Sequence, residues 1–336
     1  MKLNAYSFAA GAVALSATTL AMPTLYRRIV DGSGFFKCMA TAITSGSWPT
    51  ACGSEVVNDI GLIQGVDVDD LAIDFTISTN PSIMGLSSSK LTANLIKIPA
   101  GFPYTSFPVT DSSQVDAGVE VAQFTTPTSV TTVVGTTVST AVGNSQLNIL
   151  PGQEDSFVAF MSKLIKQASL ALTIKGKLDI TITAKIPFST VSKSVSIPNI
   201  AYSAPITLQG CNDFANVKFL KQISLTKDAA GQYTLTSSIN IFNPSQLVLT
   251  MGDVKFNTID KNGLTVGVTT FAGLRLAMGD NIVTAVTVFT SVDVIAGGTF
   301  AFQGFDGSST NRVLAKALAG VKADITIPQL SPNTSA

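Results

Sequence analysis

The most constraining feature of this chain is an alternating stretch that ends in an Asn-Pro-Ser tripeptide. Between Tyr233 and Ile241, apolar residues alternate with Thr, Ser and Asn. A period of two predicts a half-buried β-strand, because successive side chains of a strand point to opposite faces of the sheet. Asn243 and Pro244 are expected at the end of that strand, since proline lacks the backbone donor that a ladder needs.

The first half of the chain contains the same sequence pattern. An alternating run from Leu71 to Ile77 precedes Asn80 and Pro81, which are followed by serine. Further segments correspond between the halves, such as Ser196–Ile200 and Thr326–Leu330. This internal similarity favours a tandem repeat. We therefore expect a mainly β fold made of two tandem antiparallel immunoglobulin-like β-sandwiches, each with one short helix.

The expected organisation follows from where loop-like and strand-like segments alternate. A loop-like stalk or cap is expected after the N-terminal segment, and the chain between the two sandwiches is expected to be a linker containing Pro205, Gly210 and Cys211. The expected ranges are an N-terminal segment at 1–25, the stalk at 26–59, the first sandwich at 60–200, the linker at 201–222, the second sandwich at 223–330 and a tail at 331–336.

Composition limits the classes of partner. Charged residues make up 12% of the chain, and Lys plus Arg equal Asp plus Glu at 21 each. Nucleic-acid binding needs a basic face, so this balance excludes nucleic acid as an expected partner. Val, Ile, Thr and Ser are abundant, which is typical of strands rather than helices.

The N-terminal segment is typical of a targeting sequence. Lys2 gives a positive start, and an uncharged stretch of small and apolar residues extends from Ala5 to Leu20. The alternative is an uncleaved anchor, because the apolar stretch to Leu25 is just long enough to span a bilayer. Both interpretations predict entry to the secretory route, with the protein secreted, at the cell surface or in an organelle lumen.

The cysteines and one sequon suggest covalent modifications. Cys38 and Cys52 are spaced to close a short loop by a disulfide in an oxidising compartment, and the alternative is a set of buried thiols. Asn333 begins a glycosylation sequon, Asn-Thr-Ser, near the end of the chain. The cysteines do not have zinc-ligand spacing, so neither a metal nor a cofactor is expected.

The clearest helix pattern lies between Asp155 and Ser169. Such a stripe usually packs into a core, although it can also cover an apolar cavity or lie on a membrane surface. Asp155 or Ser156 is expected to cap the helix. A second helix is expected between Ser308 and Gly320. The apolar stripe of the first helix, our candidate ligand-binding residues, consists of Phe157, Phe160, Met161, Leu164 and Ile165.

An enzymatic function is not expected. The chain contains no histidine, which removes Ser-His-Asp and Cys-His arrangements and the usual general base near neutral pH. We found no Gly-rich phosphate loop between a strand and a helix. A pair of carboxylates of the glycosidase type would need a defined spacing, and no pair of Asp or Glu residues is singled out.

The motifs of the second half resemble a known superfamily. A strand ending in Asn-Pro, a following Leu-x-Leu strand and the segment Gly263–Gly267 are similar to the late-embryogenesis-abundant group 2, or water-stress and hypersensitive-response (WHy), β-sandwich. The resemblance covers residues 223–330 best and 71–200 weakly. It implies immunoglobulin-like sandwiches, often in the lumen of lysosomes or vacuoles, with lipid as a proposed ligand and no catalytic residues.

These observations lead to two expectations about function. The first is a non-enzymatic extracytoplasmic β-sandwich protein that binds lipid, a membrane or another apolar ligand. The alternative is a structural module that meets other proteins or glycans at the cell surface or in an organelle lumen, with partners that the sequence does not identify.

Overall fold

A computed structural model gives the structure of this chain and describes most of it from Ile63 onward. The described residues are 38, 41, 42, 45, 47, 49–52, 63–95, 104–106, 109–116, 119–124, 132–134, 137–185, 192–290 and 296–331. The expected targeting segment at 1–25 and the sequon at Asn333 lie outside these residues.

The first half is built mainly from strands, as expected from its alternating sequence. Its helix α5 (Glu154–Lys166) falls where the apolar stripe predicted it. The strands are β1 (Ile63–Asp69), β2 (Leu71–Asp74), β3 (Ile83–Leu95), β4 (Tyr104–Ser106), β5 (Val109–Asp116), β6 (Val119–Phe124), β7 (Thr132–Val134), β8 (Thr137–Ile149), β9 (Ser169–Lys185) and β10 (Ser192–Gln209).

The second half is also mainly β, and its helix α6 (Arg312–Leu318) lies within the expected range. The chain also contains two short 3-10 helices. One, η3 (Thr50–Cys52), precedes β1, and the other, η4 (Asn212–Phe214), connects the two halves. The strands are β11 (Val217–Lys227), β12 (Tyr233–Asn243), β13 (Leu247–Ile259), β14 (Thr265–Leu276), β15 (Gly279–Phe289), β16 (Gly298–Gln303) and β17 (Lys322–Ile327).

Strand pairing in the first half runs through neighbours that are mostly antiparallel. β1 and β2 both pair with β3, which pairs with β8, and β8 pairs with β6 and β7. From β6 the ladder continues to β5, then to β9 and β10, while β4 also pairs with β9. β10 in turn lies beside β1. The strands of the first half therefore surround a common interior.

Strand pairing in the second half follows a similar course around a core. β11 pairs with β12, β12 with β15, β15 with β14, and β14 with β13. β13 then pairs with β16, and β16 pairs with β17, which lies beside β11. Buried apolar side chains from both halves belong to one continuous core.

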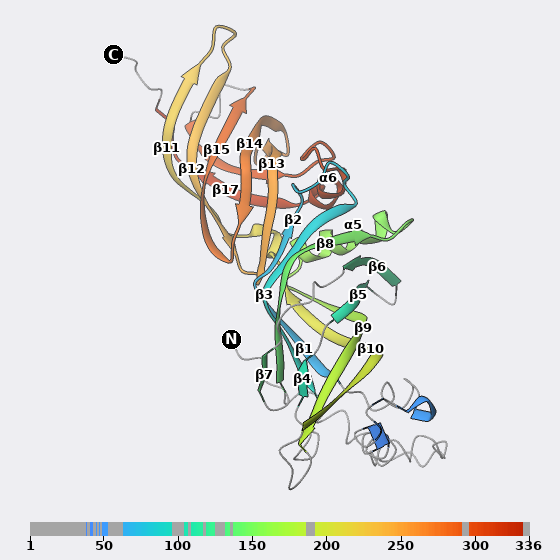
Figure 1. The fold of residues 1–336 in the computed structure, drawn as a ribbon. Coiled ribbons are helices and arrows are strands. Elements are labelled where there is room, and N and C mark those ends of the chain that lie inside the picture. Colours follow the sequence, from blue (N-terminus) through green and yellow to red (C-terminus); the bar gives the residue numbers. More distant parts are fainter. Residues whose placement is uncertain are drawn as a thin grey trace, which may run out of the picture.

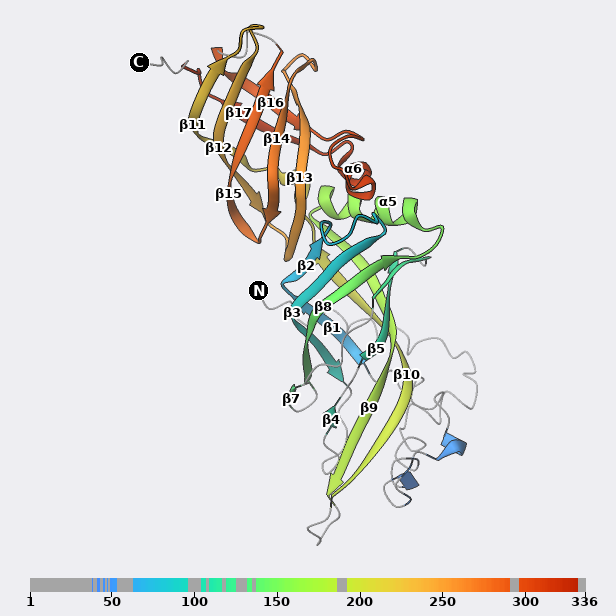
Figure 2. The same cartoon turned by 45° about the horizontal axis from the view of Figure 1, so that its top comes forward.

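The two halves share a sheet. β2 pairs in parallel with β13, with Leu71 opposite Leu247 and Asp74 opposite Thr250. The backbone N–H of Phe75 extends this pairing by donating to the carbonyl oxygen of Thr250 at 2.9 Å. The molecule is elongated, with β11–β17 at one end, β9 and β10 reaching the other, and α5 and α6 at the junction (Figures 1 and 2).

The expected linker at 201–222 is wrong. β10 extends to Gln209 because it is paired with β9 along its whole length, and Pro205 lies within that ladder opposite Thr173. β11 begins at Val217, so only a short connection containing η4 separates the two strands. Proline and glycine predicted a break here, but long-range pairing with β9 decided the conformation.

The second Asn-Pro-Ser tripeptide begins at the last residue of a strand, as expected, whereas β2 ends at Asp74, before the first tripeptide is reached. β12 ends at Asn243, and Asn80 lies in the loop between β2 and β3. Their surroundings differ, because Asn243 is fully buried while Asn80 is exposed. The side chain of Asn243 donates to the carbonyl oxygen of Leu247 at 2.8 Å and accepts from Ser245 Oγ at 2.6 Å. Asn80 Oδ1 accepts only from the backbone N–H of Ser82, at 3.0 Å, among the described residues.

We predict that Asn243→Ala destabilises the protein far more than Asn80→Ala. The first substitution leaves a buried carbonyl and a buried hydroxyl short of partners, which costs about 1–3 kcal/mol. The second exposes a backbone N–H that water can satisfy, so its cost stays below about 1 kcal/mol. Urea unfolding of both variants measures the difference. Equal losses would contradict the structural distinction between the two turns.

Candidate functional site

The helix α5 has one buried face and carries all of the predicted stripe. Its five large apolar side chains recur at helical spacing, which lets them lie together on that face. Phe157 and Phe160 contact one another, with ring centroids 5.8 Å apart. The buried residues of the helix are Phe157, Phe160, Met161, Leu164 and Ile165.

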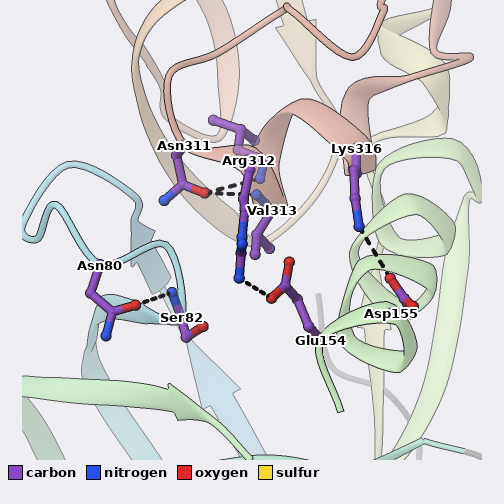
Figure 3. A network of polar contacts seen from close by, with 9 residues as sticks. Asn80, Ser82, Glu154, Asp155, Asn311, Arg312, Val313 and Lys316 are labelled. Atoms are coloured by element: carbon purple, nitrogen blue, oxygen red, sulfur yellow. Dashed lines mark hydrogen bonds and ion pairs between the residues drawn. The ribbon is translucent and has the colours of Figure 1, made fainter. Parts of the chain in front are cut away.

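The first turn of α5 forms ion pairs with residues of the second half of the chain. Glu154 and Asp155 suit a helix N-terminus because their charge opposes the helix dipole. Glu154 Oε2 lies 2.5 Å from Arg312 Nη2, and Asp155 Oδ1 lies 3.2 Å from Lys316 Nζ, both on α6 (Figure 3). The expected cap by Asp155 or Ser156 is wrong, because Gln153 occupies that position without a side-chain cap.

The last turn of α5 is held by the chain that leaves β10. The N–H of Cys211 donates to the carbonyl oxygen of Leu164 at 3.0 Å, and that of Asn212 to Gln167 at 3.2 Å. These bonds satisfy carbonyls that a helix C-terminus otherwise leaves unpaired. Gly210 allows the approach, since a Cβ there would lie 2.1 Å from the carbonyl oxygen of Gln167.

A cavity lies beneath α5, within the interior of the first half. Its free volume is about 40 Å³, and the pocket spans about 570 Å³ only when the gaps between atoms and space open to solvent are included. Its wall is formed by the helix α5 and by the strands β1, β2, β3, β6, β8, β9 and β10. The lining residues are Val68, Leu71, Ile73, Leu86, Ser88, Leu91, Phe124, Val142, Leu147, Phe160, Leu164, Leu172, Ile174, Ile206 and Leu208.

Ser88 is the one polar residue among those that line the cavity. Its hydroxyl donates to the carbonyl oxygen of Asp69 at 2.6 Å and accepts from the N–H of Lys90 at 3.3 Å. The hydroxyl therefore already has partners in the protein. The wall suits an apolar molecule, or the apolar part of one, because it offers no free polar group to a ligand.

The predicted ligand-binding residues divide into two groups in the structure. Phe160 and Leu164 line the cavity, whereas Phe157, Met161 and Ile165 are buried elsewhere. The strand residues of the wall were not predicted. Their period-two pattern predicts burial, but it does not tell which strands face one another across an interior.

A buried polar cluster lies at the junction, outside the cavity wall. The thiol of Cys211 donates to Ser245 Oγ at 3.7 Å, and Ser245 Oγ donates to Asn243 Oδ1. Burial raises the pKa of Cys211 to about 11, although the bond to Ser245 opposes this shift. A thiol with this pKa stays protonated near neutral pH, so it is a poor nucleophile and metal ligand.

Asp213 in η4 lies between α5 and β17. Burial raises the pKa of this carboxyl, while the charge of Lys166 and a hydrogen bond from the backbone of Lys322 act in the opposite direction. Asn212, Asp213 and Phe214 all have positive φ angles, near 50°. This unusual turn directs the chain from β10 into the second half.

The described residues contain no group of three or more His, Cys, Asp or Glu placed to hold a metal ion. Cys38 and Cys52 are joined by a disulfide, and Cys211 is a free thiol. Within the part of the chain that the structure describes, no helix has both the length and the apolar character needed to cross a bilayer.

Comparisons with known proteins give little beyond a family without an assigned function. Residues 119–258, less than half of the chain, match a family described as "Protein of unknown function (DUF3712)". The match begins at β6, includes α5 and ends in β13, so it covers one wall of the cavity and the junction. No curated protein matches this chain.

Among solved structures, the Bacillus anthracis TIE protein is similar at 8% sequence identity. The alignment covers 80% of this chain and 56% of that chain, with a TM-score of 0.12. The chain thus spans little more than half the length of that protein. A TM-score this low carries no argument about fold or function.

Proposed function

We propose that this chain is a non-enzymatic extracytoplasmic protein that binds lipid or another apolar ligand in the cavity beneath α5. The observation that carries the proposal is the character of the wall. Its residues are apolar apart from Ser88, and the hydroxyl of Ser88 is already hydrogen-bonded within the protein. Burial of apolar surface would therefore supply the binding energy, at roughly 25 cal/mol per Å².

The way that α5 is held supports a binding role. Exposed ion pairs such as Arg312–Glu154 contribute only about 0–1 kcal/mol each. The C-terminal end has a stronger attachment, because the backbone N–H groups of Cys211 and Asn212 donate to the carbonyl oxygens of Leu164 and Gln167. The helix is therefore fixed most firmly at the end from which Leu164 lines the cavity, so this part of the wall is already formed without a ligand.

We also propose the finer fold and family assignment. The chain would form two tandem β-sandwich units of the late-embryogenesis-abundant group 2 type, each with one helix. Support comes from the two separate sets of strand pairing, β1–β10 and β11–β17, each with α5 or α6 beside it. The sharing of β2 with β13 means that these units are not independent.

For the compartment, we propose the secretory route, with the apolar segment from Ala5 to Leu25 acting as a cleaved signal or an anchor. The disulfide between Cys38 and Cys52 supports an oxidising environment, since such bonds persist outside the reducing cytosol.

A second candidate function is a surface for other proteins or glycans. On the outer side of β15, Ile282 is 73% exposed and Val286 and Val288 are each 37% exposed. Val286 lies opposite Thr236 on β12, and Val288 lies opposite Thr234. This exposed apolar and hydroxyl-bearing face suits contact with a partner.

We predict that lipid co-purifies with the full chain and that Val142→Phe displaces it. Val142 lines the cavity, so the larger ring occupies ligand space at little cost in stability. Val254 is equally apolar and fully buried, but it lies in the core of the second half. Val254→Phe is the matched control, and overpacking there should cost about 1–3 kcal/mol.

Mass spectrometry of organic extracts and thermal unfolding measure the two effects. The proposal expects lipid in the wild type and in folded Val254→Phe, and much less in Val142→Phe. A wild-type protein without extractable lipid, whose Val142→Phe variant is as destabilised as Val254→Phe, would show that the cavity is ordinary core.

The compartment proposal has its own test. Expressed in a secretory host, the chain should be translocated, and mass analysis without reductant should show Cys38 and Cys52 linked. N-terminal sequencing of the product then distinguishes a cleaved signal from an anchor. A cytosolic product that retains Met1 and has free thiols at both positions would refute the proposal.

A further inference from the structure

The cavity has an inner end and an outer end, which differ in exposure. Leu147, Phe160 and Leu164 line the inner end, and each exposes 1% or less of its surface. Val68 and Leu91 also line the cavity, but they are only partly buried. These two residues lie opposite one another on β1 and β3, so their side chains share a face of the sheet. The cavity therefore reaches the surface beside Val68 and Leu91 and ends beneath α5.

The free space in the cavity is small. Its free volume is about 40 Å³. A group of the size of a water molecule needs about 10–15 Å³ of free volume, so roughly three such groups fit. An engineered protein cavity that binds benzene measures about 150 Å³, and the free space here is about a quarter of that. A ring does not fit, whereas a hydrocarbon chain needs only the width of one methylene at each point along its length.

The wall at the inner end is held in place from behind. The ring of Phe160 contacts the ring of Phe157, with centroids 5.8 Å apart, and Phe157 is itself fully buried. One turn further along α5, the carbonyl oxygen of Leu164 accepts the N–H of Cys211 at 3.0 Å. A close-packed interior of this kind is strained by an added group. The inner end therefore selects among ligands by their shape.

The polarity of the wall fixes which end of a ligand enters. The hydroxyl of Ser88 donates to the carbonyl oxygen of Asp69 and accepts from the N–H of Lys90, so it is already paired. A hydroxyl or carboxylate placed at the inner end would lose its water partners and gain none, which costs free energy. A methyl group has no such cost. A ligand with one polar head therefore enters with its methyl end first.

We infer that the cavity binds the methyl end of a single unbranched hydrocarbon chain, and that Phe160 is the residue that excludes rings. This inference rests on the proposed function and specifies its ligand as a single-chain lipid held by its tail. The chain leaves the cavity beside Val68 and Leu91, so its polar head stays in contact with water. Sterols and aromatic compounds are excluded by their width.

The test measures binding to the full chain, after lipid removal, by titration calorimetry. Its three probes are dodecanoate, the ω-hydroxy derivative of dodecanoate and the ω-phenyl derivative, which differ only at the end remote from the carboxylate. Dodecanoate should bind. The two derivatives should each bind about tenfold more weakly or worse, because the hydroxyl loses its hydrogen bonds and the phenyl group exceeds the free space.

The outcomes separate this inference from the proposed function. If either derivative binds as tightly as dodecanoate, the methyl-first orientation or the size limit is wrong, while the cavity proposal still stands. If none of the three probes binds, both are refuted. These measurements need no variant to fold.

A pair of variants tests the role of Phe160. Phe160→Ala adds roughly the space of one ring to the free volume, so affinity for the ω-phenyl derivative should rise by about tenfold. Phe271→Ala is the matched control, because Phe271 is also buried, packs between Phe256 and Phe302 in the second half and does not line the cavity. It should leave the affinity for all three probes unchanged.

Thermal unfolding of both variants shows whether each is folded at the temperature of the titration. Equal affinities of the two folded variants for the ω-phenyl derivative would overturn the assignment of Phe160. If Phe160→Ala does not fold, the wild-type series alone decides whether the cavity excludes a ring.

Discussion

The structure depends on how α5 is held over the open end of the first half. Its apolar face contributes to the core, and its last carbonyls accept hydrogen bonds from the chain that leaves β10. Gly210 makes this possible, because any side chain there would collide with the helix backbone. With the helix in this place, an interior surrounded by strands is closed at one end and has an apolar wall. Phe160 and Leu164 of the helix complete the apolar wall to which Leu172 and Ile206 belong.

The second half of the chain contacts α5 and the strands next to it. β2 pairs with β13 in parallel, so a strand from one half adds to the sheet of the other. α6 approaches the first turn of α5 through Arg312 and Lys316 (Figure 3). The turn that contains Asn243 and Ser245 contacts Cys211, which lies directly after Gly210. The junction therefore supports the helix at both ends, and the two halves work as one body around it.

Local sequence predicted a substantial part of this fold. The period of two predicted the strands, the helical stripe predicted α5, and proline predicted where β12 ends. Local sequence did not predict whether the two strands on either side of such a turn pair with one another. The same Asn-Pro-Ser tripeptide joins β2 to β3, which pair directly, and joins β12 to β13, which pair with different neighbours.

In the candidate site, too, local sequence predicted the residues on the helix but not those on the strands. Phe160 and Leu164 could be selected from the stripe, because a helix face is a local property. The residues that face them come from strands far apart in the sequence, such as Leu86 on β3 and Leu208 on β10. Burial of those residues was predictable, but their convergence on one cavity depends on register and on long-range pairing. The linker expected at 201–222 failed for the same reason.

The most direct measurement is a crystal structure of the full chain purified without lipid removal. If α5 closes a ligand site, elongated electron density that the protein does not explain should lie between Phe160 and the strands β3, β8 and β9. Side chains from opposite walls that touch and fill this space, with no density between them, would contradict the account.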